Sequence, residues 1–141
     1  ASMRATNAAA ARIVLQYQPH AATDVTGFGL AGHLLEMLEA SDVSATLRAD
    51  AIPALPGART LADHGVESTM AAENRARLKG FSAHAEHALL VDPQTSGGLL
   101  VGVNPVQAIG CLQALLDAGL TAAVIGEVEP AKEGDSRLRL E

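Results

Sequence analysis

The feature that most constrains this chain is a glycine-rich stretch that runs directly into an amphipathic helix pattern. The stretch spans residues 23–33 and reads TDVTGFGLAGH. Leucine and methionine then recur at intervals that line one side of a helix, which predicts a helix over residues 27–40. A second glycine-rich stretch, DPQTSGG, lies far downstream at residues 92–98. The two stretches are the densest in special residues, so they are the first candidates for a functional surface.

Asp24 has two interpretations. In the first, Asp24 or Thr26 caps the following helix by accepting a hydrogen bond from a free backbone N–H, which is worth about 1 kcal/mol. In the second, the Asp24 carboxylate binds Mg²⁺ and the amides of Gly27 to Gly29 lie beside a phosphate, because helix N-termini favour anions. Spacing alone favours the cap. The G-x-G-x-x-G match completed by Gly32 is weak evidence for dinucleotide binding, since no clear strand precedes it.

The second stretch also has two interpretations. Thr95, Ser96, Gly97 and Gly98 are typical of a simple turn. The same residues can form a backbone nest that binds an anion. Two such stretches in one small domain favour a phosphate-handling surface to which both contribute.

Composition limits the possible partners. The 141 residues fit one domain or part of a larger protein. A net charge of −6 without a Lys/Arg cluster argues against a nucleic-acid or anionic-membrane surface, so a phosphate site would depend on backbone N–H groups or a metal ion. There is 1 cysteine, which excludes an internal disulfide framework. Without a membrane-length apolar run or a signal segment, the expected location is the cytoplasm.

Periodicity and punctuation residues predict interleaved helices and strands. Helices are expected at residues 3–17, 27–40, 58–64 and 105–118, and strands at 43–47, 81–87, 122–128 and, as an edge, 138–140. Residues 89–91 and 99–103 are expected to be two buried strands joined by the second glycine-rich stretch, and residues 67–80 a long surface loop with at most one helical turn. The expected fold is an α/β (α+β) layered sandwich with a mixed sheet and packed helices.

The remaining candidate residues are weaker. A metal role for His84 and His87 is disfavoured, because three or four ligands are normally needed. Cys111 lies among apolar helix residues and is expected to be a core residue and not a nucleophile. His33 either shares a helix face with the first motif or is a packed histidine. For the Asn74–Arg75 pair, a solvated loop is favoured over contact with a ligand or partner.

Several strings together resemble the C-terminal domain of selenophosphate synthetase (selenide, water dikinase), in the aminoimidazole ribonucleotide synthetase-like superfamily. The strings are TDVTGFGLAGH at residues 23–33 and DPQTSGGLL at residues 92–100, in the order that family has them. Shorter matches lie around them, at Asn7–Ala10, Leu55–Ala58, Ser68–Thr69 and Asn74–Arg75. The resemblance covers roughly residues 3–129.

The resemblance implies a function and a set of site residues. It implies the Mg²⁺-dependent conversion of ATP, selenide and water to selenophosphate, AMP and phosphate by a homodimer, on a partly ferredoxin-like fold. Asp24 resembles the one metal-binding aspartate that this domain supplies, and Thr26, Gly27 and Gly29 would shape the backbone beside it. The family gives no firm ligand assignment for residues 95–98, which stay candidates for contact with ATP.

Two departures from the family matter. The family's catalytic Cys or selenocysteine, its essential Lys and most of its ATP-binding groups belong to an N-terminal domain, and Cys111 lies in no matching motif. Ala22 stands where relatives often have Cys, a change between small residues. Residues 1–141 are therefore expected to form a single domain that is inactive alone and binds Mg²⁺–ATP weakly or not at all. Two alternatives stay open, a related synthetase with another acceptor and a non-catalytic binding module.

Overall fold

The computed structural model describes residues 4–78 and 85–141 of the chain. The described helices are α1 (Ala8–Val14), α2 (Gly29–Ser41), α3 (Ala58–Asp63), α4 (Ala71–Ala76), α5 (Ala85–Val91) and α6 (Pro105–Asp117), with short 3₁₀ turns at Leu15–Tyr17 and Ala49–Ala51. The described strands are β1 (Ala21–Asp24), β2 (Val43–Leu47), β3 (Leu99–Gly102), β4 (Gly126–Pro130) and β5 (Leu138–Leu140). No helix among the described residues is both long and apolar enough to cross a membrane.

The strands form two sheets. β1 and β3 make an antiparallel pair, and a three-stranded sheet has the order β4-β2-β5. β2 runs antiparallel to β4 and parallel to β5, so this second sheet is mixed, as predicted. Pro130 ends β4 on the edge of that sheet, where a residue without a backbone N–H is tolerated. The α+β layered class is confirmed, with the strands divided between two sheets.

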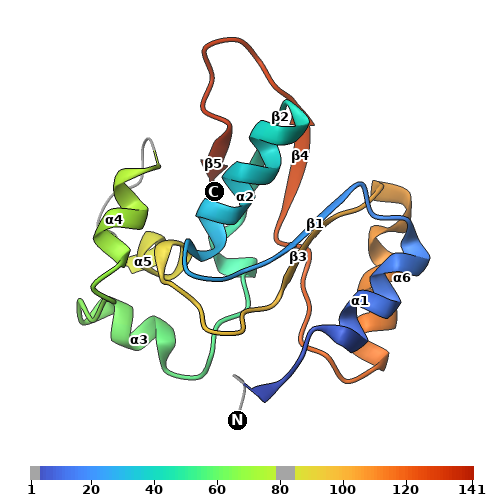
Figure 1. Cartoon of the computed structure of the whole chain (residues 1–141), viewed down its shortest axis with the longest axis horizontal. Coiled ribbons are helices and arrows are strands. Elements are labelled where there is room, and N and C mark those ends of the chain that lie inside the picture. Colours follow the sequence, from blue (N-terminus) through green and yellow to red (C-terminus); the bar gives the residue numbers. More distant parts are fainter. Residues whose placement is uncertain (1–3, 79–84) are drawn as a thin grey trace.

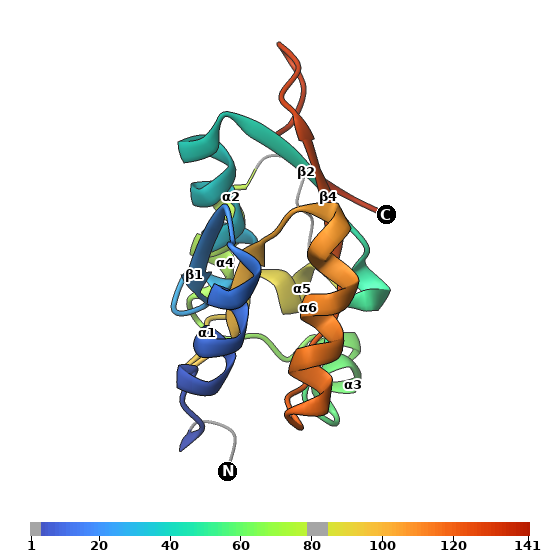
Figure 2. The same ribbon diagram turned by 90° about the vertical axis from the view of Figure 1, so that its right-hand side faces the viewer.

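The β1–β3 ladder lies between two groups of helices. Figure 1 shows α1 and α6 side by side at one end of the molecule and α3, α4 and α5 at the other. In Figure 2, which is turned by 90°, α1 also lies beside α6, so the two helices are neighbours in space. Helix α2 lies between the groups, next to β2. The two glycine-rich stretches connect this ladder to α2 and to α5, which places them near the middle of the fold.

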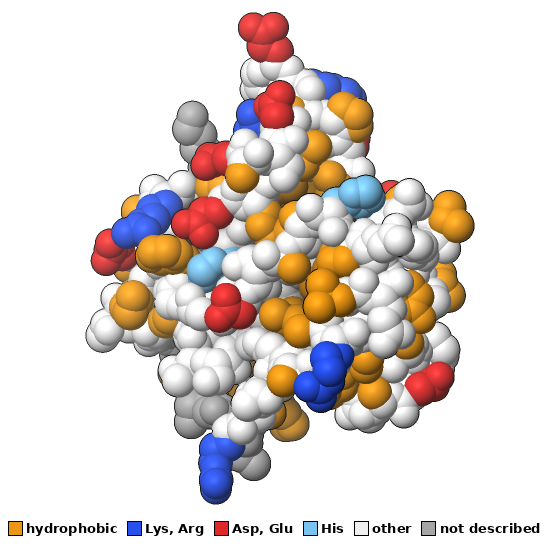
Figure 3. Space-filling model, turned by 45° about the vertical axis from the view of Figure 1, so that its right-hand side comes forward, with side chains coloured by type: hydrophobic (Ala, Val, Ile, Leu, Met, Phe, Trp, Pro, Cys, Tyr) orange, Lys and Arg blue, Asp and Glu red, His pale blue; other side chains and the backbone are white. Residues whose placement is uncertain are grey.

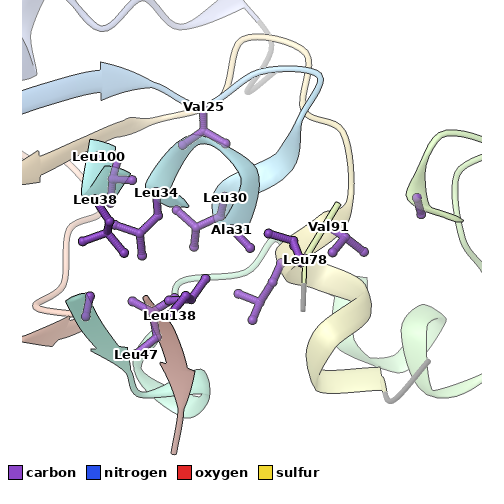
Figure 4. Packing of buried hydrophobic residues seen from close by; sticks show 13 residues of the cluster. Val25, Leu30, Ala31, Leu34, Leu38, Leu47, Leu78, Val91, Leu100 and Leu138 are labelled. Carbon is purple, nitrogen blue, oxygen red and sulfur yellow. The ribbon is translucent and has the colours of Figure 1, made fainter. Parts of the chain in front are cut away.

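The core is aliphatic, as the scarcity of aromatic residues predicts. Figure 4 shows Leu34 and Leu38 of α2 pointing into a space that Leu47 of β2 and Leu138 of β5 also fill. Val91 of α5 belongs to the same buried cluster. Helix α2 therefore packs its apolar stripe against the mixed sheet and α5 at once, which fixes the start of α2.

The strand predictions for residues 81–87 and 89–91 were wrong wherever the structure describes these residues. Residues 81–84 lie outside the described part of the chain, and α5 occupies Ala85–Val91. Leu90 and Val91 are buried as expected, but they belong to a helix that packs against α2. A short apolar run cannot be assigned to strand or helix by periodicity alone. The strand partner of β3 is β1 and not residues 89–91.

Several other elements begin at residues that differ from the predicted ones. β4 begins at Gly126 and not at residue 122, because its five residues pair with the five residues of β2. The first helix begins at Ala8, and the predicted loop over residues 67–80 contains the six-residue helix α4. The predicted helices at α2, α3 and α6 and the strands β2 and β5 are confirmed.

Charged side chains are scattered over the visible surface. On the face in Figure 3, Lys and Arg side chains lie apart from one another, and Asp and Glu side chains are mixed among them. That face therefore offers no continuous positive surface for a polyanion, in agreement with the net charge of −6.

Candidate functional site

The β1–β3 ladder brings the two glycine-rich stretches together. Asp24, the last residue of β1, pairs with Leu99, the first residue of β3. The N–H of Val25 donates to the carbonyl of Gly98 at 2.9 Å, and the N–H of Gln94 donates to the carbonyl of Thr26 at 3.0 Å. Two segments about seventy residues apart in sequence therefore form one hydrogen-bonded surface, as the prediction of a shared site requires.

Asp24 is not a helix cap. Its side chain is exposed and has no hydrogen bond or ion pair with the described residues. The N-cap position of α2 belongs to Phe28, four residues further on, and no side chain caps the helix there. The Thr26 hydroxyl bonds to His33 and caps nothing. The cap interpretation was therefore wrong for both residues, and the Asp24 carboxylate is free to bind a cation.

Two glycines of the motifs are required by packing. Gly29 has a φ of +71°, and a Cβ there would lie 2.8 Å from the carbonyl oxygen of Leu90 at the end of α5. A Cβ on Gly97 would lie 2.3 Å from the carbonyl oxygen of Val25. The Gly97 carbonyl is also engaged, because it accepts a hydrogen bond from Asn7 at 3.0 Å. These glycines let the two loops and α5 approach one another closely.

Only some residues of the two glycine-rich stretches are accessible to a ligand. Thr95, Ser96 and Gly98 are exposed, and a Cβ on Gly98 would meet nothing within 4 Å. Beside them, the N–H groups of Gly27 and Phe28 are used by no hydrogen bond of the described residues. Free N–H groups and an open glycine backbone next to an exposed carboxylate suit an anion accompanied by a cation.

His33 and Asn74 are buried, and sequence reasoning did not assign either to the site. Asn74, predicted to lie in a solvated loop, is only 4% exposed and donates to the carbonyls of Gly27 and Val91. One sequence signal was available for Asn74. Ala71 and Leu78, three residues before it and four after it, are also buried, which is the spacing of one helix face.

The site is incomplete within this chain. A hollow beside the first motif, lined by residues that include Phe28, Asn74 and Arg77, has a volume of about 90 Å³. Sites for small molecules typically measure roughly 300–1,000 Å³. The described residues contain no group of three or more His, Cys, Asp or Glu side chains that could hold a metal ion. His87 lies on α5, whereas His84 lies outside the described residues. The prediction that these two histidines do not form a metal site is therefore untested.

Two further titratable groups have shifted pKa values. Burial, and then the neighbouring Glu67 carboxylate, raise the pKa of Asp92 in the second motif. Burial raises the pKa of the Cys111 thiol on α6, which favours the protonated form. Cys111 is buried, which confirms it as an interior residue.

The geometry can be compared with known proteins. Residues 2–139 match the family described as AIR synthase related protein, C-terminal domain. The chain belongs to this family. Selenide, water dikinase of Pseudomonas straminea is 43% identical over 117 residues, which cover 78% of this chain and 33% of that protein. The selenide, water dikinases of Myxococcus xanthus and Geobacter metallireducens are 41% and 40% identical, over 84% and 90% of this chain.

Family membership confirms the resemblance read from the two motifs. The chain spans between 33% and 38% of the length of these three relatives, so it corresponds to one part of each of them. In the AIR synthase related family this part is the C-terminal domain. The small hollow, and the lack of a group of three or more possible metal ligands among the described residues, agree with a domain that supplies only part of a site.

Proposed function

We propose that this chain is the C-terminal domain of a selenide, water dikinase and that it supplies Asp24 to a Mg²⁺–ATP site shared with the rest of the enzyme. The observation that carries the proposal is the pairing of an exposed, unpartnered Asp24 with the second motif across the β1–β3 ladder. The reaction is the one the resemblance implies: ATP, selenide and water give selenophosphate, AMP and phosphate.

The residues present fit a magnesium ion that is held only partly by this domain. Mg²⁺ prefers oxygen ligands and is usually bound through one or two carboxylates, with substrate phosphates and waters completing its shell. Asp24 offers one such carboxylate, free of competing partners in the described structure. When bound, the metal would neutralise charge that develops on the phosphate oxygens during transfer.

The chain's own residues have distinct roles in this proposal. Asp24 would hold the cation, and the free N–H groups of Gly27 and Phe28 would be available to donate to a phosphate oxygen. Thr95, Ser96 and Gly98 provide exposed polar and backbone groups on the other side of the ladder. Gly29 and Gly97 act by packing, since they let the loops close up. The Cys or selenocysteine chemistry and most ATP contacts come from the remainder of the enzyme.

The experiment that tests the proposal uses the full-length parent enzyme with Mg²⁺, ATP and selenide under anaerobic conditions. Phosphorus NMR should show selenophosphate and AMP. The family description also fits a synthetase with another acceptor, so a parallel reaction contains formylglycinamidine ribonucleotide in place of selenide. ATP consumption with that acceptor alone would replace the proposal with the related synthetase. If the parent consumes ATP with neither selenide nor formylglycinamidine ribonucleotide, the non-catalytic module is favoured.

The resemblance also implies a homodimer, and the composition of the chain predicts a cytoplasmic location. Sedimentation of the full-length parent should give twice the protomer mass, and fractionation of the source cells should recover it with cytoplasmic enzymes. A monomer at micromolar concentration, or recovery with membranes, would contradict these two expectations.

A further inference from the structure

The Thr26–Gly27 segment has its inward-facing polar groups bonded and its N–H groups free. The Thr26 carbonyl accepts from the N–H groups of Gly29 at 3.1 Å and Gln94 at 3.0 Å. The Thr26 hydroxyl and the Gly27 carbonyl are each engaged by a side chain from another element. The carbonyl and hydroxyl groups of the segment are therefore bonded to the protein, while its N–H groups make no hydrogen bond with the described residues.

The first of these side chains is His33 on α2. It is only 9% exposed, and its Nε2 lies 2.9 Å from Oγ1 of Thr26. Its Nδ1 lies 3.4 Å from a carboxylate oxygen of Glu36, and its ring packs against Phe28 with 5.5 Å between ring centroids. Contacts on three sides hold the imidazole in one orientation, so it can fix the position of the Thr26 side chain.

The second side chain is Asn74 on α4. Its Nδ2 donates to the carbonyl of Gly27 at 2.8 Å and to the carbonyl of Val91 at 2.9 Å. Val91 ends α5 and directly precedes the second glycine-rich motif. One buried amide therefore joins the loop that follows Asp24 to the start of the other motif, across 47 and 17 residues of sequence.

We infer that His33 and Asn74 are positioning residues that hold the Thr26–Gly27 segment in the geometry the Mg²⁺–ATP site needs. The inference rests on the proposed function. Both side chains are buried and their polar groups are bonded to the protein, so each acts through a neighbour, His33 through the Thr26 hydroxyl and Asn74 through the Gly27 carbonyl. Donors fixed before the ligand arrives need no reorganisation when it binds, which is the main source of electrostatic stabilisation in such sites.

The test uses the full-length parent enzyme and compares variants that differ only in hydrogen bonding. His33→Leu and Asn74→Leu remove the bonds to the segment while keeping a side chain of comparable bulk. His33→Gln keeps a polar group that can reach Thr26. Leu38→Ala is the matched control, because it weakens the same helix in the core, where Leu38 is 2% exposed, without touching the segment.

We expect the KM for Mg²⁺–ATP to rise on the order of 10-fold in both leucine variants, as for loss of a supporting residue around a metal site. His33→Gln should restore most of the affinity. Thr26→Val should raise the KM as much as His33→Leu does. The double variant with both substitutions should have a KM no higher than either single variant, because all three remove the same Thr26–His33 hydrogen bond. A KM that stays at the wild-type value in both leucine variants overturns the inference. The inference also fails if Leu38→Ala raises the KM as much as the leucine variants do, when all of them lower the melting temperature equally.

A second readout separates this inference from the proposed function. Amide deuterium exchange of the peptide covering residues 25–30 in the full-length protein should speed up in His33→Leu and Asn74→Leu, and not in Leu38→Ala. This holds whatever acceptor the enzyme uses. If the parent makes no selenophosphate but exchange speeds up as described, the positioning role stands and the proposed function fails. If the parent makes selenophosphate but exchange is unchanged, the proposed function stands and the positioning role fails. If His33→Leu does not fold, Thr26→Val decides on both readouts for that bond, and if Asn74→Leu does not fold, Asn74→Ala decides for the bond to Gly27.

Discussion

Gly97 and Gly98 are adjacent residues with different surroundings. The space where a Cβ of Gly97 would lie is filled by Val25 and Gln94, whereas no atom lies within 4 Å of that position at Gly98. Packing of the domain therefore requires glycine at 97 but not at 98. Gly98 is also exposed beside Asp24, so its open side faces the candidate ligand surface.

These surroundings predict opposite results for two alanine substitutions. Gly97→Ala should lower the free energy of unfolding of the 141-residue chain by about 1–3 kcal/mol, because the new methyl group collides with backbone. Gly98→Ala should be neutral or raise it by up to about 1 kcal/mol, because the unfolded chain loses freedom. Urea unfolding of both variants measures the difference. Equal stabilities would contradict the packing around Gly97.

Asp92 gives a pH-dependent prediction. Its pKa in the folded protein is raised above 3.8, so folding disfavours the carboxylate form. The unfolded state releases this proton at lower pH, and the free energy of unfolding falls as the pH rises from about 4 through the raised folded pKa. Asp92→Asn should therefore be more stable than the wild type at pH 7, with the gain vanishing below pH 3.8. Urea midpoints at the two pH values check this, and a less stable variant at pH 7 would rule out the desolvation argument.

At the scale of elements, α6 illustrates how local signals define a helix. Pro105 begins the helix, Gly119 follows it with a φ of +75°, and Asn104 accepts a hydrogen bond from the N–H of Val106 at 3.0 Å. A proline at the first position and a glycine just past the end are preferred for known steric reasons. These signals lie within a few residues of the helix, which is why the sequence predicts it.

The cap of α6 can be tested alone. Asn104→Ala should lower the free energy of unfolding by about 1 kcal/mol, since the Val106 N–H loses its acceptor. Gln113→Ala is the control in the same helix, because Gln113 bonds only to Asp117 on the exposed face and should cost about 0.5 kcal/mol or less. Thermal unfolding of the two variants provides the comparison. A Gln113 variant as destabilised as the Asn104 variant would show that the cap adds nothing.

The sequence could predict elements with local start and stop signals, and it could not predict those fixed by distant contacts. Helices α2, α3 and α6 have such signals, whereas Leu90 and Val91 are helical because α5 packs on α2. The same limit applies to the site. The two motifs and Asp24 could be found from sequence. The helical spacing around Asn74 indicates that it is buried, but it does not indicate the partner of its hydrogen bond, Gly27, which lies 47 residues away.

At the scale of the whole molecule, our proposal is that the chain supplies one side of a shared site. It spans about a third of its selenide, water dikinase relatives, and its hollow beside the first motif is too small for a nucleotide. Two loops, joined by the β1–β3 ladder and supported by α2, α4 and α5, hold a free carboxylate at the surface. The fold therefore acts as a rigid support for a few exposed groups.

An incomplete site predicts weak binding by this chain alone. Isothermal titration calorimetry of the 141-residue chain with Mg²⁺–ATP should give a Kd weaker than about 100 μM, because one carboxylate and a few amides replace little of the ligand's hydration. The full-length parent, titrated in parallel, should bind more tightly by a factor of about 10 or more. Micromolar binding to the chain alone would mean that the domain holds a complete nucleotide site.

Whether Asp24 binds the metal is tested by the Mg²⁺ dependence of selenophosphate formation by the full-length parent and its Asp24→Asn variant. Asp63→Asn, another exposed aspartate, is the control. If Asp24 binds the metal, Asp24→Asn should fold with unchanged stability, lose activity by about 100-fold or more, and need more Mg²⁺ for half-maximal rate, while Asp63→Asn behaves as wild type. A near-normal rate and Mg²⁺ requirement in Asp24→Asn would show that Asp24 is not a ligand and would contradict the account.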